Sequence, residues 1–134
     1  MIVFMQILMS VLAMLGMNTR PDVEFAPLPA GTFAQYITRT DTVLYNQLDH
    51  PCEADPDLCF MAIAHEVGGH RLALEQHGIL AGINEESAYL ATINLTVQNQ
   101  RANAFAYRYW HIWAQRNKAE CDQLKIVGTS RAGC

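Results

Sequence analysis

The segment AIAHEVGGHRLALEQHG, residues 62–78, constrains the fold of this chain more than any other. It has the composition of a helix that runs from about Leu58 to Gln76 and ends before a glycine, yet it carries two adjacent glycines in its middle. Each glycine inside a helix costs about 1 kcal/mol relative to alanine. We therefore expect either an irregular backbone or unusually close packing at Gly68 and Gly69.

Two histidines flank the glycine pair, and they are five residues apart. In a regular helix, at about 100° per residue, His70 lies roughly 140° around the axis from His65, so the two rings cannot bind one ion. A single wide turn with i→i+5 hydrogen bonds, called a π-bulge, places residues at this spacing nearly in line. The sequence therefore predicts a widened turn at Val67–Gly69 that brings His70 onto the face of His65.

Two histidines on one helix face are typical of zinc sites, and a catalytic zinc takes three protein ligands and a water. The third ligand is expected from INEESAYL, residues 83–90, where Glu85 and Glu86 open the next helix after the chain reverses direction. These observations leave both glutamates as candidates. Glu66, which follows His65 directly, would be the base that deprotonates the zinc-bound water.

The motifs HEVGGH and NEESAY, in this order, resemble those of the gluzincins, zinc metallopeptidases with a His-Glu-x-x-His helix and a glutamate on a following helix. The resemblance covers about residues 42–95. It implies peptide-bond hydrolysis, Zn²⁺ as cofactor, a peptide or protein substrate, and His65, His70 and Glu85 as the zinc ligands. It also implies a minimal zincin-like domain with a short edge strand, TVLYNQ at residues 42–47, beside the substrate.

The chain departs from the gluzincin pattern in two places. One is the extra residue in His-Glu-x-x-x-His, a spacing also found in a bacterial metalloprotease family that processes modified peptide toxins and antitoxins. The other is Tyr89, which stands where the family often has an aspartate that orients a histidine. Tyr89 is instead a candidate catalytic residue, a donor to the oxyanion, as are Tyr107 and Tyr109.

Other interpretations of the same residues stay open. The histidines can be structural, in which case the chain is a non-catalytic, membrane-associated helical protein. The inserted residue can have abolished metal binding in a degenerate zincin that keeps the fold. His70 and His77 share a helix face and offer an ion site without Glu85, while Glu85 and Glu86 also suit a helix N-terminus through the helix dipole.

Length, charge and the first residues limit the remaining possibilities. The chain has 134 residues, enough for one domain with its own core, and a net charge of −4 with scattered basic residues argues against a nucleic-acid partner. Residues 1–17 are apolar except for Gln6 and Ser10, which is short for a membrane span and suits a signal peptide or anchor. The alternative is a buried N-terminal helix, and residues 18–134 form the catalytic domain in either case.

The four cysteines favour an oxidising compartment. CEADPDLC, residues 52–59, encloses a short loop that a disulfide can close, and Cys121 can pair with Cys134. Together with the apolar start, the cysteines predict a secreted, periplasmic or membrane-anchored protein.

The expected elements give an α+β fold that is mostly helical. A linker over residues 18–31 is followed by a strand at 41–47, a loop in which Asp55 or Asp57 caps the first helix, and a long helical segment over 84–117. Mediocre helix formers at residues 92–100 allow a break there, and the tail from Glu120 is expected to be irregular.

Overall fold

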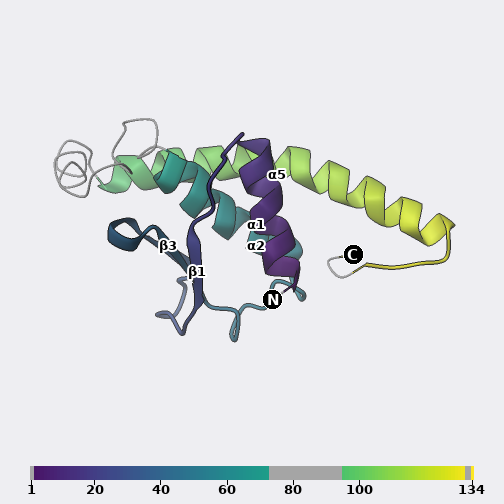
Figure 1. Cartoon of the computed structure of the whole chain (residues 1–134), viewed down its shortest axis with the longest axis horizontal. Helices are drawn as coiled ribbons and strands as arrows, with labels where there is room; N and C mark the ends of the chain where they lie inside the picture. The colour runs from purple at the N-terminus through teal and green to yellow at the C-terminus, as the bar shows by residue number, and fades with distance from the viewer. Residues whose placement is uncertain (1, 73–94, 132–133) are drawn as a thin grey trace.

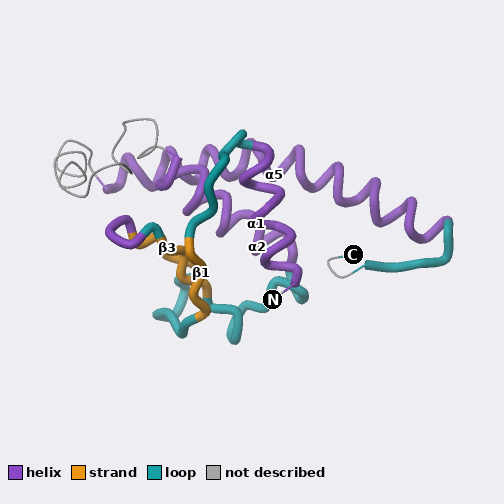
Figure 2. Tube along the Cα trace, viewed as in Figure 1, coloured by secondary structure: helices purple, strands orange, loops and turns teal. Residues whose placement is uncertain are grey.

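The computed structural model describes residues 2–72, 95–131 and 134. Helices α1, α2 and α5 and a π-helical segment, η2, lie together on one side of a small three-stranded sheet (Figures 1 and 2). The α+β class with mostly helical content is confirmed.

Helix α1, Ile2–Met14, is formed by the apolar N-terminal segment and packs against α2 and η2. Six of its side chains are buried in the core: Val3, Phe4, Ile7, Leu8, Val11 and Leu12. Among the residues that the structure describes, no helix combines the length and the apolar character needed to cross a membrane. The role of residues 1–17 as an export signal or membrane anchor stays a prediction.

The sheet has the strand order β1-β3-β2, with β1 at Asp22–Phe25, β2 at Ala34–Ile37 and β3 at Thr42–Tyr45. Strand β3 pairs in parallel with β1 and antiparallel with β2. The prediction of a strand at β3 is confirmed, but its place at the sheet edge is wrong, because β1 and β2 are the edges.

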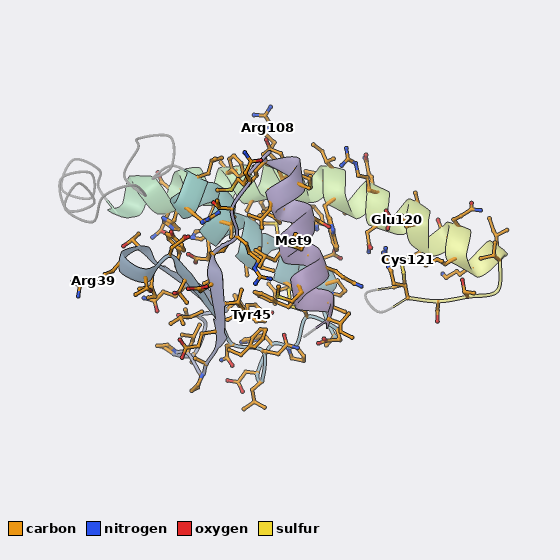
Figure 3. All side chains as sticks on the ribbon, viewed as in Figure 1. Met9, Arg39, Tyr45, Arg108, Glu120 and Cys121 are labelled. Carbon is orange, nitrogen blue, oxygen red and sulfur yellow. A yellow bond between two sulfur atoms is a disulfide. The ribbon has the colours of Figure 1, made fainter. Side chains whose placement is uncertain are left out.

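Two segments without a strand signal supply those edges. Strand β1 lies inside the predicted linker, between Pro21 and Pro27, where the prolines flank the four paired residues and do not interrupt them. Strand β2 is joined to β3 by a short 3₁₀ turn, η1 at Thr38–Thr40, and by Asp41 in the left-handed region with φ 49°. Arg39 marks this turn at the outer end of the sheet in Figure 3.

Helix α2, Pro56–Ile63, begins as the sequence predicts. The Asp55 carboxylate accepts a hydrogen bond from the backbone N–H of Leu58 at 3.1 Å, which confirms one of the two proposed caps. The disulfide Cys52–Cys59 closes the preceding loop onto the first turns of the helix.

Helix α5, Leu95–Ile126, is continuous over its whole described length. It crosses the other helices and extends beyond them, and the tail then folds back along it (Figure 1). The predicted irregular tail from Glu120 is therefore wrong as far as Ile126. The disulfide Cys121–Cys134 holds the returning tail on the helix, where Figure 3 labels Cys121.

Candidate metal centre

The histidine segment is a π-helix, η2 at Ala64–Arg71, which continues directly from α2. The widened turn predicted at Val67–Gly69 is thus confirmed, and the wide geometry extends over more residues than expected. As a result the Nε2 atoms of His65 and His70 lie 3.1 Å apart, with ring centroids 4.9 Å apart.

The two glycines of η2 lie directly against α5. A Cβ atom on Gly69 would be 2.2 Å from the Cβ and 2.5 Å from the Cα of Ala102, and one on Gly68 would be 2.3 Å from the ring of Phe105. A side chain at Gly69 would require the backbone of α5 to move, and one at Gly68 would require the Phe105 ring to move. The glycine pair therefore serves both functions expected of it, because it lies in the irregular backbone and lets α5 approach closely.

His65, Glu66 and His70 form a candidate metal centre, since one ligand atom from each lies within 4.8 Å of the others. Tetrahedral zinc with Zn–N bonds of about 2.0–2.1 Å places two nitrogen ligands roughly 3.4 Å apart. The 3.1 Å separation of the two Nε2 atoms is close to this distance. The spacing of the two Nε2 atoms is therefore compatible with a pair of zinc ligands.

Helix α5 holds the two imidazoles through asparagines four residues apart, which lie on one face of the helix. The Oδ1 atom of Asn103 is 2.7 Å from Nδ1 of His65, and Oδ1 of Asn99 is 3.1 Å from Nε2 of His70. A proton on Nδ1 of His65 donates to Asn103 and leaves a lone pair on Nε2. Such a contact on the far nitrogen is typical of histidines that bind metals.

Glu66 is buried beside the histidines, with 8% of its surface exposed, and its Oε1 lies 3.8 Å from Nε2 of His65. Burial raises the pKa of Glu66 to about 7, although a hydrogen bond from the backbone N–H of Tyr36 in β2 acts in the opposite direction. A carboxylate with a pKa near neutrality can both accept and return a proton at physiological pH.

His70 is neutral in this environment. Burial is the main cause that lowers its pKa to about 4, and the neighbouring His65 lowers it further, while the hydrogen bond to Asn99 raises it. A metal binds only the neutral imidazole, so His70 is in the state required of a ligand without first losing a proton.

These two pKa shifts predict how pH affects the metal-free protein. As pH rises from 4.5 to about 7, the unfolded chain releases the Glu66 proton before the folded state does, so stability falls. Between about pH 4 and 6.5 only the unfolded chain holds the His70 proton, so stability rises with pH. The two effects offset one another in the overlapping range.

The Glu66→Gln variant removes only the loss of stability with rising pH that the Glu66 carboxyl causes. Its free energy of unfolding should therefore rise from pH 4 to 6.5 more steeply than that of the unsubstituted protein. Urea unfolding at a series of pH values, in the presence of a chelator, measures the difference. Identical slopes for the two proteins would contradict the raised pKa of Glu66.

Comparisons with protein-family models, curated protein sequences and solved structures found no match. The interpretation of the centre therefore depends on its own geometry.

The end of η2 is fixed to the sheet by Arg71, which is 1% exposed. Its Nε and terminal nitrogen donate to the two oxygens of Asp41 at 2.7 and 3.1 Å, and its other terminal nitrogen donates to the backbone oxygen of Thr19 at 2.9 Å. The Tyr36 hydroxyl also donates to Asp41, at 2.5 Å, and burial together with this contact raises the pKa of Tyr36. The residue after His70 is thus held by charged hydrogen bonds.

Several predicted residues lie outside the described part of the chain, namely His77, Glu85, Glu86 and Tyr89. Tyr107 and Tyr109 are both on α5, where Tyr107 contacts Trp110 and His111 and Tyr109 stacks on Phe105 at 4.6 Å. Sequence reasoning missed Asn99, Asn103 and Arg71. The four-residue spacing of the two asparagines was the available signal for the first two.

Proposed function

We propose that this protein is a zinc-dependent peptidase in which His65 and His70 bind the metal and Glu66 is the general base. The observation that supports this most strongly is the π-helical turn, because it gathers two Nε2 atoms at 3.1 Å beside a buried carboxylate. A wide turn and two glycines are costly features in a helix, and π-turns are frequent at functional sites.

Each side chain of the centre has a distinct role in the proposed reaction. Glu66 takes a proton from the attacking water and returns it to the leaving amine, for which its pKa of about 7 is well suited. Asn103 keeps the Nε2 lone pair of His65 directed at the metal. Zinc, when bound, lowers the pKa of water and polarises the scissile carbonyl.

The remaining components of the proposal come from the sequence. Glu85 is the proposed third ligand and Tyr89 a proposed oxyanion donor. The substrate is a peptide or protein, and no nucleic-acid partner is proposed. The disulfides Cys52–Cys59 and Cys121–Cys134 support a site of action outside the cytosol, either secreted, periplasmic or membrane-anchored through residues 1–17.

The test combines metal content with hydrolysis. The purified chain should contain one zinc ion per molecule by elemental analysis and should cleave an unstructured protein such as casein. A zinc chelator should abolish cleavage, and added Zn²⁺ should restore it. Protein without stoichiometric metal, whose fold is unaffected by the chelator, would favour a structural role for the histidines instead.

A further inference from the structure

We propose that Asn99 on α5 is itself a ligand of the metal, contributing its side-chain oxygen as a third protein donor in the described part of the chain. This inference rests on the proposed zinc site. It adds a ligand from a helix that the sequence motifs do not include, and it is compatible with a further ligand from Glu85.

The geometry distinguishes Asn99 from Asn103. Asn103 contacts Nδ1 of His65, the nitrogen that points away from the metal position. Asn99 contacts Nε2 of His70, the same atom that lies 3.1 Å from Nε2 of His65. The Oδ1 atom of Asn99 therefore adjoins a nitrogen that would bind zinc, whereas Oδ1 of Asn103 contacts the nitrogen of the His65 ring that would not bind zinc.

The distribution of protons also favours a cation at this position. Nε2 of His65 carries a lone pair if Nδ1 donates to Asn103, and the Asn99 oxygen can only accept. Nε2 of His70 is 3.1 Å from both of these acceptors, so a proton there would be shared between two weak hydrogen bonds. A cation interacts favourably with all three lone pairs at once.

The close contact between η2 and α5 explains how a short side chain reaches the centre. Gly69 lies against the backbone of Ala102, which is three residues after Asn99 and therefore on the same side of α5. An amide oxygen is a harder donor than imidazole. Two imidazole nitrogens and one amide oxygen together suit Zn²⁺ and similar divalent ions such as Co²⁺.

Substitution of Asn99 by cysteine tests coordination directly, with Co²⁺ as the probe. A thiolate bound to Co²⁺ gives an intense sulfur-to-metal charge-transfer band in the near ultraviolet, and a residue outside the coordination sphere gives none. The Zn–S bond of about 2.3 Å is longer than the Zn–O bond of about 2.0–2.2 Å and compensates in part for the shorter side chain. Asn103→Cys, one turn along the same helix face, is the matched control, and its spectrum is compared at a Co²⁺ content that elemental analysis shows to be equal to that of Asn99→Cys.

A second measurement uses Asn99→Ala, with Gln100→Ala at an exposed position of α5 as its control. We expect at least a tenfold loss of Zn²⁺ affinity in competition with a chromogenic chelator for Asn99→Ala and no change for Gln100→Ala. A charge-transfer band for Asn99→Cys but not Asn103→Cys, together with this loss, supports the proposal. Normal Co²⁺ binding without the band, and unchanged affinity in Asn99→Ala, would overturn it and leave the zinc site in place. If the unsubstituted protein bound neither ion, the proposed function itself would be wrong.

Discussion

Replacing Glu66 with glutamine is expected to reduce peptide hydrolysis by a factor of about 10² to 10⁴ and to leave one zinc ion bound. Glutamine keeps the size of the side chain and can still accept the hydrogen bond from Tyr36, but it cannot take a proton from water. Steady-state kinetics give the loss of kcat, and elemental analysis of the same preparation gives the metal content.

Two features make this substitution a sharp test. Glu66 is buried and its pKa is raised, so the uncharged amide should not destabilise the protein at neutral pH. Glu24→Gln, at an exposed position of β1, is the matched control and should retain full activity. A Glu66→Gln protein with unreduced hydrolysis would refute the proposed role of this carboxylate.

The most local part of the centre could be predicted from the sequence. The wide turn depends on two histidines five residues apart and on the glycines between them, all within one helical segment. The backbone geometry of a single helical turn is set by the residues within it, so the spacing of the histidines and glycines was enough to predict the wide turn. The cap at Asp55 and the pairing of nearby cysteines were predictable for the same reason.

The parts that could not be predicted involve partners distant in the chain. Asn99 and Asn103 reach the histidines across 29 and 38 residues, and Arg71 meets Asp41 across 30. The four-residue spacing of the asparagines places them on one face of a helix, but it does not say which element that face contacts. That contact depends on how α5 and the sheet pack onto η2. Strand β3 also has four residues, but three of them are β-branched or aromatic, whereas β1 and β2 have two each. The edge strands were missed because this signal is weaker and because they take their stability from pairing with β3.

Replacing Gly69 with alanine should lower the free energy of unfolding by about 3 kcal/mol, the upper end of the usual cost of overpacking a core. The new methyl group would lie 2.5 Å from the Cα of Ala102, so the backbone of α5 would have to move. Because α5 also carries Asn99 and Asn103, the same movement would withdraw both asparagines from the histidines. Zinc affinity should therefore fall together with stability, as measured by urea unfolding and chelator competition.

The neighbouring Gly68→Ala variant shows whether the loss of stability comes from crowding the backbone of α5 or only one of its side chains. Its methyl group would meet the ring of Phe105, a side chain that can rotate or be replaced, and not the backbone of α5. We expect a smaller loss of stability for Gly68→Ala, and we expect a second substitution, Phe105→Leu, to recover part of it. The exchange Ala102→Gly should recover little in the Gly69→Ala background, because the added methyl group would still crowd the main chain of α5.

Wild-type stability and zinc affinity in Gly69→Ala would show that α5 does not depend on this glycine for its position, and the link between the wide turn and the two asparagines would then fail.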